Sequence, residues 1–190
     1  MKNQYVIITA LENELSSSSI PNGIPVIYSG IGKVNATMAT MKAIQEHQAS
    51  FILNFGTVGK INSDLSGLVE VSKVIQRDMM AEPLAPRGQV PFCSKAYEHF
   101  SGRGDVVCGS GDSFVTSQDL WLQNQNVDVV DMELFAIAAV AAEYQLPWRS
   151  FKYITDEANE SSGDDWMSKV RLGEALFLKE LNELLSSESL

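Results

Sequence analysis

The sequence predicts a single α/β domain that spans residues 1–190. Short apolar runs, rich in β-branched residues, alternate along the chain with stretches whose apolar residues recur every three or four positions. Glycines follow several of the apolar runs, where the strands of an α/β sheet are expected to end. A chain of 190 residues is also within the range of one compact domain.

The N-terminal half is expected to hold three strands and one helix. The continuous apolar run Tyr5–Thr9 predicts a buried strand, and Ile24–Tyr28 predicts a second one. The glycine-flanked turn Ser29–Gly32 then opens a helix with an apolar stripe made of Val34, Met38, Met41 and Ile44. The third predicted strand, Phe51–Phe55, runs into Gly56–Gly59.

The C-terminal half adds four predicted strands, within Val69–Gln76 and at Asp105–Cys108, Val127–Val130 and Trp148–Ile154. A loop rich in Pro and Gly, Glu82–Pro91, separates the first two. The third strand runs directly into a helix, Glu133–Tyr144, which Pro147 ends. The last helix starts near Asp164 or Asp165, either of which can cap it. One side of that helix is expected to carry Trp166, Val170, Phe177, Leu181 and Leu184.

The charge and the cysteines limit the classes of partner. A net charge of −10 argues against a nucleic-acid backbone or an anionic membrane, because both require clustered Lys and Arg. The two cysteines, Cys93 and Cys108, lie in no metal-ligand spacing and are expected to be reduced thiols of a cytoplasmic protein. No signal peptide is visible, and no stretch approaches the ~20 apolar residues that span a bilayer. We therefore expect a small molecule as the partner.

Carboxylates stand at three predicted strand ends, the usual place for a site in an α/β sheet. Glu12 and Glu14 follow the first strand, Asp131 and Glu133 lie at an apolar strand–helix junction, and Asp156 follows the last strand. Each position also has an ordinary explanation. Acids are favoured at helix N-termini, and Asp is common in strand-end turns. Burying an ionised carboxylate at so apolar a junction is costly without a partner, so a functional role there is as well supported as a helix-start acid.

The segment Gly109–Val115 is a fourth candidate, although a tight turn explains its glycines and aspartate equally well. The chain contains neither a P-loop pattern nor the GxGxxG dinucleotide pattern. His47 and His99 have no metal partners by spacing, and His47 is expected at the surface, at the end of a helix. The candidate catalytic groups that remain are carboxylates, and they predict acid/base chemistry without a metal or a bound cofactor.

Taken together, these segments resemble the nucleoside phosphorylase and nucleosidase superfamily, and within it the methylthioadenosine/S-adenosylhomocysteine nucleosidases. The matching segments occur in the family's order and are 10-ALENE-14, 29-SGIGKVNA-36, 54-NFGTVG-59, 111-GDSF-114, 130-VDME-133 and 154-ITD-156. The resemblance implies a three-layer α/β/α sandwich with a mixed, partly barrel-like central sheet. It also implies a homodimer that hydrolyses the N-glycosidic bond of a purine nucleoside.

The resemblance also implies roles for individual residues. Glu14 matches the glutamate that activates water, Glu133 the one that holds the ribose hydroxyls, and Asp156 the aspartate that serves purine N7. Residues that match positions around the substrate and the water are Leu11, Thr57, Phe114, Val115, Met132 and Lys152. Lys152 stands where the family often has arginine, and lysine lacks its planar fork of donors.

Elementary chemistry supports these roles. Breaking an N-glycosidic bond builds positive charge on the sugar and negative charge on the leaving purine. A carboxylic acid beside the purine and a carboxylate beside the sugar therefore both stabilise the transition state. Two further functions stay open at this point. A purine nucleoside phosphorylase would need a phosphate cradle, whereas 10-ALENE-14 is acidic and repels phosphate. A catalytically weak nucleoside-binding relative would bind without turnover.

Overall fold

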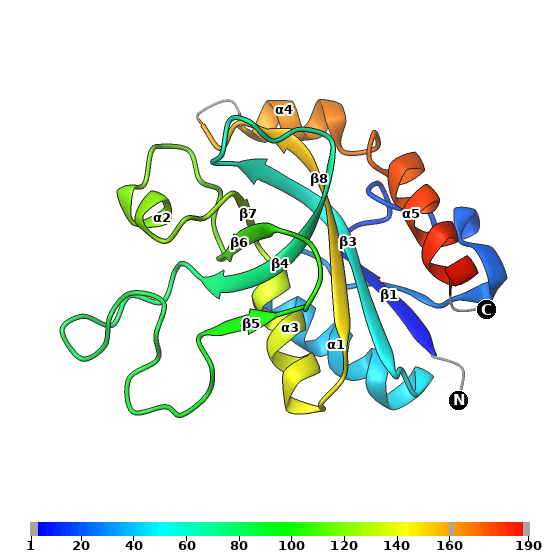
Figure 1. The fold of residues 1–190 in the computed structure, drawn as a ribbon, viewed down its shortest axis with the longest axis horizontal. Coiled ribbons are helices and arrows are strands. Elements are labelled where there is room, and N and C mark those ends of the chain that lie inside the picture. Colours follow the sequence, from blue (N-terminus) through cyan, green and yellow to red (C-terminus); the bar gives the residue numbers. More distant parts are fainter. Residues whose placement is uncertain (1–3, 160–161, 188–190) are drawn as a thin grey trace.

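The computed structural model describes residues 4–159 and 162–187, and their strands form one eight-stranded sheet (Figure 1). The strands are β1 (Tyr5–Thr9), β2 (Val26–Tyr28), β3 (Phe51–Lys60), β4 (Leu68–Gln76), β5 (Glu98–Phe100), β6 (Val106–Ser110), β7 (Val129–Asp131) and β8 (Trp148–Asp156). The α-helices are α1 (Lys33–His47), α2 (Leu120–Asn124), α3 (Leu134–Glu143), α4 (Ser162–Lys169) and α5 (Glu174–Ser187). Two short 3-10 helices, Ser17–Ser19 and Pro21–Gly23, lie between β1 and β2.

The sheet is mixed and closes on itself over part of its width. Its strand order is β2-β1-β3-β7-β6-β4-β5, and β8 pairs with both β3 and β4. The pairings among β3, β7, β6, β4 and β8 therefore form a ring. β1, β3 and β8 run parallel, whereas β7 runs antiparallel to β3. The expected mixed, partly barrel-like sheet is confirmed.

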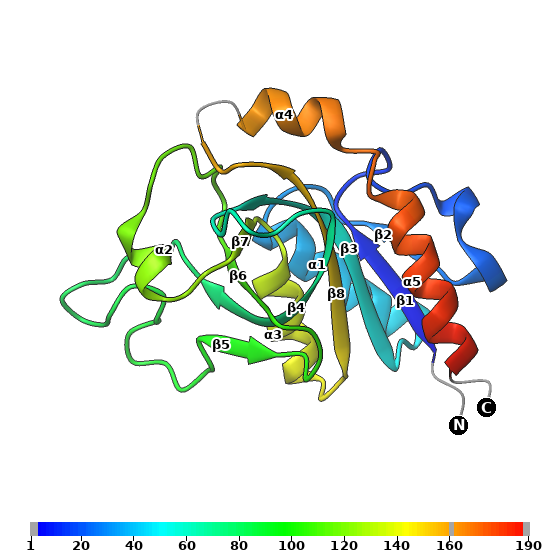
Figure 2. The ribbon, with the colours of Figure 1, turned by 45° about the horizontal axis from the view of Figure 1, so that its top comes forward.

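Helices cover the sheet on both faces, as a three-layer α/β/α sandwich requires (Figure 2). Buried residues of α1 and α3, such as Ala36 and Ile137, share one core with Val6 and Ile8 of β1. The opposite face packs against α5, where Phe177 stacks on Phe55 of β3. The side chains of neighbouring β1 residues point to opposite faces, so one strand contributes to both cores.

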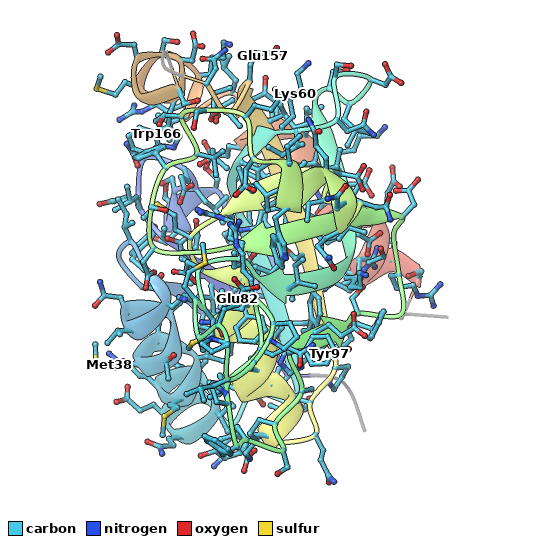
Figure 3. All side chains as sticks on the ribbon, turned by 90° about the vertical axis from the view of Figure 1, so that its left-hand side faces the viewer. Met38, Lys60, Glu82, Tyr97, Glu157 and Trp166 are labelled. Carbon is cyan, nitrogen blue, oxygen red and sulfur yellow. The ribbon has the colours of Figure 1, made fainter. Side chains whose placement is uncertain are left out.

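The apolar stripe of α1 points away from the core, contrary to the usual expectation for such a stripe. Val34 is 71% exposed and Met38 is 59% exposed, and Figure 3 shows Met38 at the outer edge of the molecule. The buried face carries small residues instead, namely Ala36, Ala39 and Ala43. Such small side chains allow α1 to approach the alanine-rich α3 closely.

The predicted single C-terminal helix is wrong, because the structure has two helices, α4 and α5, separated by residues 170–173. Gly173 lies against β8, and a Cβ added there would be 2.5 Å from the Cβ of Tyr153. Only glycine permits this approach. The break separates Trp166 of α4 from Phe177 of α5, which were expected on one helix side.

The two cysteines and the two histidines lie in different environments. Cys93 is exposed, Cys108 is buried and both are free. His47 ends α1, and the ring of His99 packs 5.2 Å from that of Phe135. Among residues 4–159 and 162–187, no helix is long and apolar enough to cross a membrane. Within the same residues, no group of three or more His, Cys, Asp or Glu side chains is arranged to hold a metal ion.

Candidate active site

One cavity of about 320 Å³ lies near the carboxyl ends of β1, β3, β7 and β8, within the usual range for small-molecule sites. The loop after β6 and helix α4 complete its wall. Eight of the residues expected at the site line it, namely Leu11, Glu14, Thr57, Phe114, Val115, Met132, Glu133 and Asp156. Strand ends that are far apart in the sequence therefore converge on one cavity.

Glu14 is buried beneath this cavity and accepts hydrogen bonds at both carboxylate oxygens. Its Oε1 accepts from the backbone N–H of Thr57 at 3.0 Å and from the Thr57 hydroxyl at 2.8 Å. Its Oε2 accepts from the backbone N–H of Leu11 at 3.0 Å and from the Thr9 hydroxyl at 3.2 Å. Four donors stabilise the ionised form of a carboxylate, which is the form that can take a proton from water.

Glu133 stands at the junction of β7 and α3, where few donors reach it. Its Oε1 accepts one hydrogen bond, at 2.8 Å, from the backbone N–H of Gly32 at the start of α1. Burial, helped by the neighbouring charge of Asp131, raises the pKa of Glu133 to about 7, although the Lys152 ammonium opposes the rise. The carboxyl group therefore changes its charge in the physiological pH range.

Asp131 and Lys152 form a buried ion pair beside the cavity. Lys152 Nζ donates to Asp131 Oδ2 at 2.7 Å, and both side chains are almost completely excluded from solvent. Burial by itself would disfavour both charges. The ammonium nevertheless holds the pKa of Asp131 below its usual value, and Asp131 and Glu133 hold the pKa of Lys152 above its own. The hydroxyl of Ser110 and the backbone N–H of Leu134 also donate to Asp131.

Lys152 was expected to contact substrate, but it is not among the residues that line the cavity. Its ammonium lies behind the wall near Gly56, where an added Cβ would be 3.2 Å from Lys152 Nζ and 3.7 Å from Glu14 Oε1. The lysine therefore acts on the site through its charge rather than by direct contact. Lysine's linear side chain, unlike the fork of arginine, suits a single buried partner.

Asp156 ends β8 and lines the cavity. Its Oδ2 accepts from the Thr155 hydroxyl at 2.9 Å, and its Oδ1 accepts from the backbone N–H of Ala158 at 2.9 Å. Gly59 of β3 lies directly against it, since an added Cβ would be 2.5 Å from Asp156 Oδ1. The glycine after Val58 in the predicted strand end is therefore what lets this carboxyl group lie at the cavity.

Phe114 and Val115 lie in a loop that a buried arginine holds in place. Arg77, directly after β4, donates to the carbonyl oxygens of Gly109, at 3.2 Å, and Gly111, at 2.8 Å, and to the carbonyl and hydroxyl groups of Ser113. Phe114 remains 53% exposed, so its ring is available to a ligand.

Arg77 and Trp166 are among the lining residues that were not expected at the site. Nothing in the local pattern distinguished Arg77 from the other arginines. The helical spacing of Trp166 grouped it with core residues of the last helix. In the structure Trp166 lies on α4, before the break that separates it from α5, and lines the cavity.

The comparisons with known proteins show the family of this chain. Residues 21–186 match the family model of the phosphorylase superfamily, so the chain belongs to that family. The 5′-methylthioadenosine/S-adenosylhomocysteine nucleosidase of Staphylococcus epidermidis is 28% identical over 170 residues, which are 76% of this chain and 74% of that protein. The aminodeoxyfutalosine nucleosidase of Helicobacter pylori is 27% identical over 182 residues, 83% and 79% of the two chains. Both of these relatives are nucleosidases.

Solved structures show the same fold. A Helicobacter pylori MTAN mutant with 5′-methylthioadenosine in its active site superposes with a TM-score of 0.86 at 21% identity, over 98% of this chain and all of that one. The nucleosidase of Neisseria meningitidis in complex with methylthio-immucillin-A gives a TM-score of 0.83 at 22% identity, with coverage of 98% and 100%. These likenesses confirm the three-layer α/β architecture.

Proposed function

We propose that the protein hydrolyses the N-glycosidic bond of a purine nucleoside of the methylthioadenosine or S-adenosylhomocysteine type. The observation that carries the proposal is the convergence of Glu14, Glu133 and Asp156 on one largely apolar cavity. Two glutamates and an aspartate supply a base, a charge stabiliser and an acid, which are the groups that this reaction needs. The curated relatives of this chain carry names of nucleosidases with such substrates.

Each carboxyl group has one task in the proposed mechanism. Asp156, in its protonated form, gives a hydrogen bond or a proton to N7 of the leaving purine, which would stack on Phe114. Glu133, in its ionised form, accepts from the ribose hydroxyls and stabilises the cationic sugar of the transition state. Glu14 removes a proton from the water that attacks the anomeric carbon. The reaction therefore requires opposite charge states for Asp156 and the two glutamates.

Hydrolysis is favoured over phosphorolysis by the groups that surround the water. Among the described residues, Arg77 is the arginine that lines the cavity. Its N–H groups already donate hydrogen bonds to Gly109, Gly111 and Ser113. It has little capacity left for phosphate. The ionised Glu14 would repel a phosphate ion at the same position.

We further propose a homodimer in the cytoplasm. The outward stripe of α1, Val34, Met38 and Met41, is an exposed apolar surface. It adjoins Ile31, which lines the cavity, so a second copy on this surface would lie beside the site. Two free cysteines agree with a reducing compartment. Sedimentation equilibrium of the purified protein checks the assembly, and a monomer at micromolar concentration contradicts it.

The deciding experiment is a phosphate-free assay of the purified protein with methylthioadenosine, S-adenosylhomocysteine, aminodeoxyfutalosine, adenosine and inosine. Release of free base without phosphate is the expected result, and the preferred nucleoside defines the 5′ substituent. Release that depends on phosphate would make the protein a phosphorylase. Binding without release in either condition would make it a catalytically inactive relative.

The variant Asp156→Asn tests the leaving-group role. We expect turnover to fall at least about 10²-fold while nucleoside binding stays measurable, because asparagine keeps the shape of the side chain but cannot give up a proton. Isothermal titration calorimetry measures the binding, and base release measures the rate. Wild-type turnover in this variant would remove Asp156 from the mechanism.

A further inference from the structure

A hydrogen-bond chain leads from helix α4 to Glu14. The indole Nε1 of Trp166 donates to the hydroxyl of Thr57 at 2.8 Å, and that hydroxyl lies 2.8 Å from Glu14 Oε1. All three side chains line the cavity. Figure 3 shows Trp166 beside the ribbon of α4. Residues that are 43 and 109 positions apart in the sequence are thereby joined at one point.

The chemistry of the three groups sets the direction of the chain. An indole N–H can only donate, so the Thr57 hydroxyl accepts from Trp166. An ionised carboxylate can only accept, so the same hydroxyl gives its single hydrogen to Glu14. With the indole in place, the hydroxyl has one favoured orientation. Without the indole, its hydrogen could also turn toward other acceptors in the cavity, including a water molecule.

We propose that Trp166 is a positioning residue for the water-activating base, acting through the Thr57 hydroxyl. The indole keeps the hydroxyl hydrogen on Glu14, and this bond, with that from the Thr57 backbone N–H, fixes Oε1 at the cavity. The inference rests on the proposed hydrolysis, because it assigns a role in activating water. It goes beyond that function by assigning to one tryptophan N–H a contribution to the rate of the chemical step.

A merely structural Trp166 would fill the wall of the cavity by its ring. The two roles predict different results for Trp166→Phe, which keeps a large aromatic ring and removes only the N–H donor. Positioning predicts a fall in kcat of about fivefold to tenfold, the effect of one lost orienting hydrogen bond, with KM within about twofold. Wall filling predicts little change in kcat and a change in KM.

Double variants show whether the effect passes through the hydroxyl. Thr57→Ser retains the hydroxyl, whereas Thr57→Val retains the shape and removes it. We expect Trp166→Phe to lower kcat as much in the Ser background as in the wild type, and to have no further effect in the Val background. Thr57→Val alone should lose at least as much as Trp166→Phe. Equal losses in the Ser and Val backgrounds would overturn the proposal.

Trp121→Phe is the matched control, because Trp121 of α2 is not among the cavity-lining residues and undergoes the same chemical change. It should leave kcat at the wild-type value, and thermal unfolding of all variants checks that they fold. A Trp166→Phe enzyme with wild-type kcat would overturn the positioning role. Failure of the wild-type protein to release base from any nucleoside would instead overturn the proposed function.

Discussion

Among the described residues, the Glu14 carboxylate accepts four hydrogen bonds and the Glu133 carboxylate accepts one, although both glutamates lie on the wall of the same cavity. Burial and the nearby Asp131 raise the pKa of Glu133 to about 7. Two glutamates of one cavity thus differ in how many donors satisfy them, and Glu133, with the raised pKa, is the one that few donors reach.

The two carboxylates differ because the segments around them supply different numbers of hydrogen-bond donors. Glu14 follows β1 in a turn whose backbone and side chains point toward it, and β3 adds the donors of Thr57. Glu133 precedes α3, but the first N–H groups of that helix donate to Asp131 and Ser110 instead. These two N–H groups are therefore not available to the Glu133 carboxylate.

The largest effect is expected from Glu14→Gln. An amide cannot take the proton of water, so kcat should fall about 10³-fold. The new NH₂ group would also face N–H and hydroxyl donors that need an acceptor, so the melting temperature should drop as well. Base release and thermal unfolding measure the two effects. Retention of a tenth of the wild-type kcat would exclude Glu14 as the base.

Glu133→Gln should lower kcat about 10²-fold with little change in KM, because the charge matters most when the sugar becomes cationic. Its effect on stability should have the opposite sign to that of Glu14→Gln. At pH 8 the variant no longer buries a poorly solvated charge, so it should be more stable by about 2 kcal/mol. Urea unfolding at pH 8 checks this, and a loss of stability would refute the contrast between the glutamates.

The stability that Glu133→Gln gains over the wild type should depend on pH. The pKa of Glu133 is about 7 in the folded protein and near its usual 4.5 when unfolded, so between these values the folded state binds more protons. Wild-type stability should therefore fall, relative to Glu133→Gln, as pH rises from 4.5 to 7. The difference should be absent below pH 4.5 and constant above about pH 8. Urea titrations of both proteins across this range measure it.

The smallest effect is expected from Thr9→Val, which removes the longest of the four hydrogen bonds to Glu14, at 3.2 Å. Three donors remain, so kcat should fall only about threefold and stability by about 1 kcal/mol. The same assays report both quantities. A loss as large as that of Glu14→Gln would show that one hydroxyl, rather than the set of donors, maintains the base.

Most of the strand and helix order followed from the sequence, and so did the candidate carboxylates. The short strand β5, the short helix α2 and the separation of α4 from α5 did not. Strand β1 is a continuous β-branched run, and α3 begins where the apolar run after Glu133 begins. The carboxyl ends of neighbouring parallel strands meet, so acids that follow β1 and β8 were expected together. Their assignment to Glu14, Glu133 and Asp156 came from the family resemblance of short, ordered segments.

The orientation of α1 and the contacts within the site depend on residues that are far apart in the sequence. Periodicity shows that Val34 and Met38 share a helix face, but only the packing of α1 on α3 reveals that this face is outside. The tertiary structure likewise pairs Lys152 with Asp131 and brings Trp166 onto Thr57. The sequence by itself determined the kind of fold and the chemical groups at its strand ends. The tertiary structure decided their charges and hydrogen bonds, because these depend on burial and on contacts between distant segments.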